Sequence, residues 1–388
     1  MRNLSKILIC LLLLAPLQNI KAQQMPLSDS AFASVITCGP GNDFYTTFGH
    51  SAIRVCDPAR GIDSVYNYGT FDFNTKNFYL KFATGRLNYC LSRRQYLEYM
   101  YEYFYEKRAV WEQPLLLTHQ ELNNLYLALE WNYRPENRYY RYDLFRDNCA
   151  TRTRDMVTSA LAHRTLWTEA TADTNLSYRE LIYPLMDRKL EWWRLGCDLL
   201  MGARCDKRCS NFEYMFLPMQ LMNQLDTTTF ADTHRPFAAK TVQILPETKD
   251  ELADSLSPTI LFWFLFVVVL CFTVIGWSKR WPMTWLDAVL FGVVGLLSLF
   301  ILAMWFGSAH YCTKLNFNLL WASPLFIYFA IALRRSNRWI VIAQIVMLVA
   351  ALLILVTGWP QHFNAAVTPI ALTLFVRLIN NLRFNNNK

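Results

Sequence analysis

Long apolar stretches in the second half of the chain constrain its fold more than any other feature. Four of them, at residues 258–277, 285–306, 317–333 and 339–359, approach the roughly 20 residues that a helix needs to cross a bilayer. Residues before about 255 are instead mixed and polar. Charged residues make up only 18% of the 388, fewer than in a typical soluble protein. We therefore expect one globular domain joined to a membrane domain.

A fifth apolar stretch, residues 366–378, is shorter and carries Arg377 near its end. Five spans behind an exported N-terminal half would leave only Lys314 in the outer loops. The cytoplasmic segments would hold Lys279, Arg280, Arg334, Arg335, Arg338, Arg377, Arg383 and Lys388. This asymmetry is the positive-inside pattern. The sequence predicts an all-α transmembrane domain of about five helices, residues 255–388, in the inner (cytoplasmic) membrane.

The N-terminus predicts export. Arg2 and Lys6 precede an apolar run at residues 7–17, and Ala22 offers a small residue for cleavage. The run is short for a spanning anchor, so we interpret residues 1–22 as a signal peptide. The globular domain, residues 23–225, would then be periplasmic and joined by a polar linker, residues 226–254, to the first span.

Composition and motifs exclude several classes of function. The formal net charge of +8 largely reflects the residues that flank the spans. No basic stripe in the N-terminal half indicates a nucleic-acid partner. The chain has no GxSxG elbow, Walker loop, HExxH or GxGxxG motif, and we expect no cofactor.

Ten cysteines leave several possibilities open. In an exported domain, disulfides are permitted among Cys38, Cys56, Cys90, Cys197, Cys205, Cys209 and Cys312, and the sequence does not give their pairing. The spacing of Cys197, Cys205 and Cys209 matches no common zinc pattern, so we expect no metal site.

The region around His50 predicts paired strands. Apolar residues 33–37 precede the turn sequence CGPGND, and a second strand continues to Val55. The segment DPARGID predicts a hairpin connection to a third strand, SVYNYGTFDF. Antiparallel pairing would bring the neighbourhood of Asn67–Thr70 close to His50, although the register stays open.

Cys149 follows the extended sequence RYYRYDLFRDN, which ends in two residues favoured as helix N-caps, Asp147 and Asn148. Apolar residues then recur at helical spacing up to Leu161. Cys149 would lie in the first turn of a buried helix, where the unpaired backbone donors and the positive end of the dipole favour a thiolate.

Other segments of the N-terminal half predict packing. The sequence from Thr118 to Asn132 shows a helix start signal and apolar residues at helical spacing. Residues 189–225 contain Trp192, Trp193 and a basic cluster. They predict either core packing or a surface that rests against the membrane.

A histidine near a thiol can make that thiol a nucleophile. We hypothesise that His50 is the base and Cys149 the nucleophile, with Asn67, or as a second choice Asp72, orienting the imidazole. The backbone N–H of Cys149 and a second donor, which could be Tyr45, would stabilise an oxyanion. The histidine precedes the cysteine, the reverse of the order in papain.

At these motifs the chain resembles the Lnb-type lipoprotein N-acyltransferase family. The matching stretches are TCGPGNDFYTTFGHSAIRV, NYGTFDFNTKNFYLKFATGRLNY, NRYYRYDLFRDNCATRTRD and EYMFLP, followed by the helical membrane domain. The order of His50 and Cys149 is also similar to that of permuted papain-like phospholipid acyltransferases. The resemblance implies an α+β fold, a permuted papain-like (NlpC/P60-like) catalytic domain, followed by the all-α membrane domain.

The resemblance also implies the reaction. An acyl chain would pass from a membrane phospholipid to Cys149, and then to the α-amino group of the diacylglyceryl-cysteine at a lipoprotein N-terminus. Two alternatives stay open. One is a papain-like cysteine hydrolase of the cell envelope, which would need an open cleft and few spans. The other is a non-catalytic, membrane-anchored assembly module in which His50 and Cys149 are structural.

Overall fold

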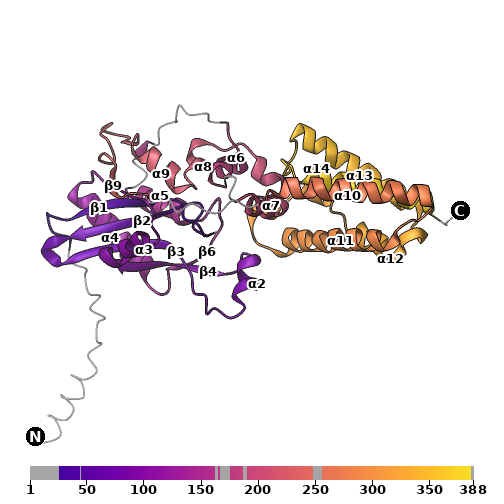
Figure 1. The fold of residues 1–388 in the computed structure, drawn as a ribbon. Coiled ribbons are helices and arrows are strands. Elements are labelled where there is room, and N and C mark those ends of the chain that lie inside the picture. The colour runs from indigo at the N-terminus through magenta and orange to yellow at the C-terminus, as the bar shows by residue number, and fades with distance from the viewer. Residues whose placement is uncertain are drawn as a thin grey trace, which may run out of the picture.

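The computed structural model describes residues 26–43, 45–161, 165–166, 175–186, 190–247 and 256–385. The predicted signal peptide lies outside these residues. Two bodies follow one another along the chain, a mixed sheet-and-helix domain and a bundle of apolar helices (Figure 1).

The strands of the N-terminal domain are β1 (Phe32–Cys38), β2 (His50–Asp57), β3 (Ile62–Thr70), β4 (Asn88–Gln95), β5 (Val110–Pro114), β6 (Tyr139–Arg141), β7 (Thr165–Leu166), β8 (Thr229–Phe230) and β9 (Val242–Leu245). Its helices are α2 (Phe78–Ala83), α3 (Tyr96–Tyr105), α4 (His119–Tyr133), α5 (Cys149–Ala160), α6 (Tyr178–Ile182), α7 (Glu191–Leu200), α8 (Asn211–Tyr214) and α9 (Pro218–Leu225).

Seven strands form one antiparallel sheet in the order β6-β4-β3-β2-β1-β5-β9. Successive side chains of a strand point to opposite faces. Val35 and Ile53 accordingly join a core with α4 and α5, whereas Ile36 and Ala52 join a second core with α3. The sheet is thus covered on both faces, and the predicted hairpin of β2 and β3 is confirmed.

The segment that follows α9 differs from the sequence prediction. Residues 226–254 were expected to form a linker, yet β8 pairs with β7 and β9 pairs with β5 at the edge of the main sheet. A polar composition did not reveal these short strands, because three of the four side chains of β9 are exposed. A strand at the edge of a sheet is held mainly by backbone hydrogen bonds, so its residues need not alternate between apolar and polar.

The C-terminal body contains α10 (Pro258–Lys279), α11 (Thr284–Gly307), α12 (Leu325–Ala332), α13 (Arg338–Thr357) and α14 (Val367–Phe384). Among the described residues, four helical segments are long and apolar enough to cross a membrane: Pro258–Lys279, Thr284–Gly307, Tyr311–Arg335 and Arg338–Thr357. This supports membrane association. The fifth span, α14, stays a prediction.

The third apolar stretch is not one continuous α-helix. α12 has 8 residues and follows two 3-10 turns, Tyr311–Thr313 and Phe317–Leu320. Polar side chains explain the interruption, because the Asn316 and Asn318 amides donate to backbone carbonyls of α7. These hydrogen bonds tie the loop to the N-terminal domain.

A polar network holds the two bodies together. The Arg179 guanidinium, fully buried, contacts Asp198 of α7 at 2.6 Å and Asp206 at 2.8 Å. The Asn364 amide, in the loop before α14, donates to the same Asp198 carboxylate at 2.8 Å. The Trp192 indole donates to the carbonyl of Leu256 beside α10 at 2.8 Å. The region around Trp192 therefore packs against the end of the membrane bundle.

A buried ion pair joins the bundle's last helix to the others. The Arg377 guanidinium, counted above as a cytoplasmic charge, is 0% exposed and contacts Asp287 of α11 at 2.6 Å. It also donates to the Thr273 hydroxyl of α10 and to the carbonyl of Pro282. Its contribution is therefore structural, linking α10, α11 and α14.

We predict that Arg377→Met destabilises the bundle by about 3–5 kcal/mol, because Asp287 would be left as an unpaired buried charge. Thermal unfolding of the detergent-solubilised full-length protein measures the effect. The double variant Arg377→Met/Asp287→Leu should recover most of the loss. A single variant as stable as the unsubstituted protein would contradict this role.

Candidate active site

His50 is the first residue of β2, placed there by a tight turn at Gly49. Gly49 has φ +78°, and a Cβ at this position would lie 2.7 Å from the carbonyl oxygen of Cys38. Only glycine fits such a close backbone approach without strain. The turn therefore places the imidazole at the end of the sheet where β1 and β2 meet.

Cys149 is the first residue of α5, as the sequence predicted. Asn148 is the N-cap: its side chain accepts from the Thr151 N–H, and the Thr151 hydroxyl accepts from the Asn148 N–H. The Asn148 amide also donates to the carbonyl of Phe216 at 2.8 Å. These contacts fix the start of the helix, and with it the position of the 5%-exposed thiol.

Asn67 of β3 holds the His50 ring. The distance between His50 Nε2 and Asn67 Oδ1 is 2.5 Å. Since an amide oxygen can only accept, Nε2 carries the proton and Nδ1 is left for a second partner. Asp72, the second choice, is exposed, and its carboxylate accepts from the Asn74 N–H instead. The structure thus brings Asn67, and not Asp72, to His50.

Cys149 is buried and His50 is half-buried, and the two side chains interact through their charges and a hydrogen bond. Burial opposes the charged form of each group, yet the net shifts run the other way. The charge of Cys149 and the hydrogen bonds of His50 with Cys149 and Asn67 raise the pKa of His50. The charge of His50, its hydrogen bond, and backbone hydrogen bonds with Ser51 and Ala150 lower the pKa of Cys149. The arrangement favours an imidazolium–thiolate pair.

The pKa values of the thiols of Cys38 and Cys56 are raised, in contrast to that of Cys149. Burial raises the pKa of Cys38 to about 12, against opposing contributions from Tyr99 and Arg108. Burial likewise raises the pKa of Cys56, with the nearby Asp63 adding to the effect. The described cysteines are all free, and among those outside the membrane helices Cys149 has the one thiol whose pKa is lowered. It is therefore the best candidate nucleophile.

The pattern of the sequence did not single out Gly69 or Tyr142. Gly69 has φ +94°, and a Cβ there would lie 3.7 Å from His50 Cε1, 3.8 Å from Cys149 Cβ and 3.6 Å from the Tyr142 ring. The register of β3 and β4 shifts between Asn67 and Thr70, which is the bulge that a glycine inside a strand can signal. At Gly69 the bare backbone therefore lies next to both His50 and Cys149.

The role of Tyr45 as an oxyanion donor stays a prediction. Its hydroxyl donates to the Asp43 carboxylate at 3.1 Å, and its side chain is 52% exposed. The described residues contain no group of three or more histidine, cysteine, aspartate or glutamate side chains that could hold a metal ion.

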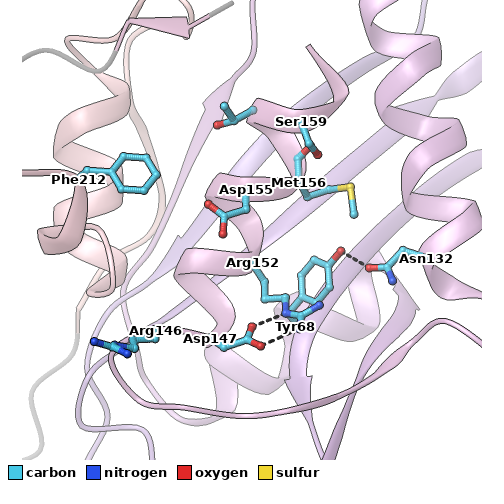
Figure 2. Close-up of a pocket in the computed structure, with 10 residues that line it drawn as sticks. Tyr68, Asn132, Arg146, Asp147, Arg152, Asp155, Met156, Ser159 and Phe212 are labelled. Carbon is cyan, nitrogen blue, oxygen red and sulfur yellow. Dashed lines mark hydrogen bonds and ion pairs between the residues drawn. The ribbon is translucent and has the colours of Figure 1, made fainter. Parts of the chain in front are cut away.

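A cavity of about 680 Å³ lies beside α5 (Figure 2). Its lining comes from the later turns of that helix and the neighbouring elements, and includes neither His50 nor Cys149. Two pairs that line it are Arg152 with Asp147, at 2.5 and 2.8 Å, and Tyr68 with Asn132, at 2.6 Å. These side chains are hydrogen-bonded to one another, and the cavity is separate from the candidate catalytic pair because neither residue of the pair lines it.

We predict that Cys149 reacts with iodoacetamide at lower pH than an ordinary thiol, because its pKa is lowered. In a His50→Ala variant burial would remain without the opposing charge, so the midpoint of the alkylation profile should move to higher pH. Mass spectrometry of the Cys149 peptide gives the profile, and Cys56 in the same sample is the internal control. An unchanged midpoint in the variant would contradict the ion pair.

Two family models match most of the chain. Residues 19–183 match the Lnb N-terminal periplasmic domain, and residues 249–388 match the Lnb transmembrane domain. No curated protein and no solved structure gives a significant match. The order of the two matches is the order of the two bodies in the structure, and His50, Asn67 and Cys149 all lie in the first. The chain belongs to the Lnb family, with a periplasmic domain followed by a transmembrane domain.

Proposed function

We propose that the chain is a lipoprotein N-acyltransferase of the inner membrane. It moves a fatty acyl chain from a phospholipid, through a thioester on Cys149, to the α-amino group of diacylglyceryl-cysteine lipoproteins. The observation that carries the proposal is the hydrogen-bonded set of Cys149, His50 and Asn67 at the start of α5. Membership of the Lnb family supports an acyltransferase. The proposal includes a circularly permuted papain-like arrangement, in which the histidine strand precedes the cysteine helix.

The first half-reaction is an ester cleavage. The Cys149 thiolate attacks the carbonyl carbon of a phospholipid ester, and the negative charge that develops on the carbonyl oxygen is stabilised by the backbone N–H of Cys149. When the tetrahedral intermediate collapses, the carbon–oxygen bond breaks. The His50 imidazolium gives its proton to the departing lysophospholipid alkoxide, which leaves the acyl group on sulfur and the imidazole neutral.

The second half-reaction is aminolysis. The neutral α-amine of the lipoprotein's N-terminal cysteine attacks the thioester carbonyl, and His50 accepts a proton from that nitrogen. The carbon–sulfur bond breaks, and the imidazolium–thiolate pair is restored. Asn67 keeps the same ring nitrogen protonated throughout, so that Nδ1 can exchange the proton in both halves.

The attachment to the membrane domain distinguishes this proposal from its alternatives. Both substrates of the acyltransferase are bilayer-embedded, and the loop before α5 is tied to the bundle where the Tyr311 N–H donates to Asp143 at 3.1 Å. A soluble-substrate hydrolase would gain little from that contact. A purely structural module would gain nothing from a thiol whose pKa is lowered.

We predict that purified protein mixed with phospholipid accumulates a fatty acyl group on Cys149, detected as a mass increase that hydroxylamine removes. Cys149→Ser should lower transfer to a lipopeptide acceptor roughly 10³-fold or more. His50→Ala should lower the rate of acylation about 10²–10⁴-fold, because the proton can no longer be delivered. An acyl group on Cys38 or Cys56 instead, or full acylation in the His50 variant, would contradict the mechanism.

A second pair of variants separates the two residues considered for orienting the imidazole. Asn67→Ala should slow acylation of Cys149 about 10²-fold, since the ring would lose its fixed orientation. Asp72→Asn, which removes a charge but keeps the side-chain cap of its turn, should leave the rate unchanged. Equal losses in both variants would argue against a specific role for Asn67.

A further inference from the structure

The segment around α2 exposes an unusual set of large apolar side chains. Phe73 is 65% exposed, Tyr79 83%, Leu80 65% and Phe82 37%. We refer to residues 73–82 as the aromatic arm. Contiguous apolar surface of this kind is uncommon on a domain that faces only water. Exposed Lys76 lies within the same stretch, and cationic residues beside aromatic ones are typical of a lipid headgroup interface.

The arm is held at the periplasmic end of the membrane bundle. The Ala309 N–H donates to the carbonyl of Thr84 at 2.8 Å, and the distance between His310 Nε2 and the carbonyl oxygen of Phe82 is 3.0 Å. Ala309 and His310 follow directly on α11, whose last turn carries the stacked rings of Trp305 and Phe306. Such rings mark the boundary of the hydrocarbon. α2 lies beside that end of the bundle in Figure 1.

A row of rings leads from the arm to the catalytic pair. The Phe73 ring is 4.9 Å from Phe71, which is 5.2 Å from Tyr89, and Tyr89 stacks on Tyr142 at 4.6 Å. Tyr142 in turn flanks Gly69, on whose other sides lie His50 and Cys149. Contacting aromatic rings therefore run from the exposed arm, through the partly buried Phe71 and the buried Tyr89, to the neighbourhood of the nucleophile.

We propose that the aromatic arm inserts into the outer leaflet of the bilayer and that the donor lipid's acyl chain follows the row of Phe71, Tyr89 and Tyr142 to Cys149. The inference rests on the proposed function for its substrate. It explains how an ester buried at a leaflet surface reaches a thiol in a domain outside the membrane. Packing against these rings would keep the chain in contact with apolar side chains along the path.

Photocrosslinking tests the position of the arm without reference to catalysis. A photoreactive phenylalanine analogue is placed at Tyr79, and in a matched control at Tyr101, which is 68% exposed. Tyr101 belongs to α3, a helix that lies farther from the bundle than α2 in Figure 1. The full-length protein is irradiated in nanodiscs of phosphatidylethanolamine and phosphatidylglycerol. We expect a lipid adduct at position 79 and little at position 101. Equal adducts at the two positions, or none at 79, would overturn the insertion.

Kinetics test the path. Tyr79→Ser/Leu80→Ser should slow acylation of Cys149 by bilayer phospholipid roughly tenfold, since apolar contact with the leaflet is lost. Acylation by the water-soluble ester p-nitrophenyl butyrate should be unchanged. The control Leu97→Ser/Tyr101→Ser, on the exposed face of α3, should behave as the unsubstituted protein with both donors. A loss with both donors, or with neither, would overturn the path. If the unsubstituted protein is acylated by neither donor, the proposed function fails, and the crosslinking result still decides the position of the arm.

Discussion

The proposed chemistry depends on two groups that favour each other's charged form in a place that disfavours charge. Cys149 is buried and His50 is half-buried, so desolvation opposes both the thiolate and the imidazolium, and yet each stabilises the other's charged form. The unpaired backbone N–H groups at the start of α5 stabilise the thiolate further, because they favour negative charge. The fold of the N-terminal domain brings this site together, because β2 contributes His50, β3 contributes Asn67 and α5 contributes Cys149.

The attachment of the N-terminal domain to the membrane domain suits the proposed reaction. In the proposed reaction, the nucleophile that attacks lipid esters must be held at a constant height above the bilayer, and a flexible linker would not do this. Arg179, Asp198 and Asn364 form a buried network between the two bodies, and Asp143 joins the turn before Cys149 to Tyr311. Buried polar networks of this kind fix one relative arrangement, since any shift would leave a charged group without its partner.

Local patterns predicted much of this architecture. The N-cap before Cys149, the hairpin of β2 and β3, and the apolar helices were all visible in residue spacing, and the hairpin brought Asn67 to His50. The contribution of Gly69 and Tyr142 was not visible, because it depends on a bulge in β3 and on a ring from a distant loop. The interruption of the third apolar stretch and the edge strand β9 were not predicted, for a similar reason. These features depend on tertiary hydrogen bonds from Asn316 and Asn318 and on backbone pairing at a sheet edge. Neither kind of contact produces a periodic pattern of residues in the sequence.

We propose that Cys149, activated by His50, passes a phospholipid acyl chain to lipoproteins. The most direct measurement is mass spectrometry of the N-terminal peptide of an exported lipoprotein. It compares a strain that lacks this protein with strains that carry the unsubstituted or the Cys149→Ser chain. We expect the triacylated peptide only with the unsubstituted chain, and the diacylated peptide with a free α-amine in the other two strains. Triacylation that persists in the strain without the protein, or that is restored by the Cys149→Ser chain, would contradict the account.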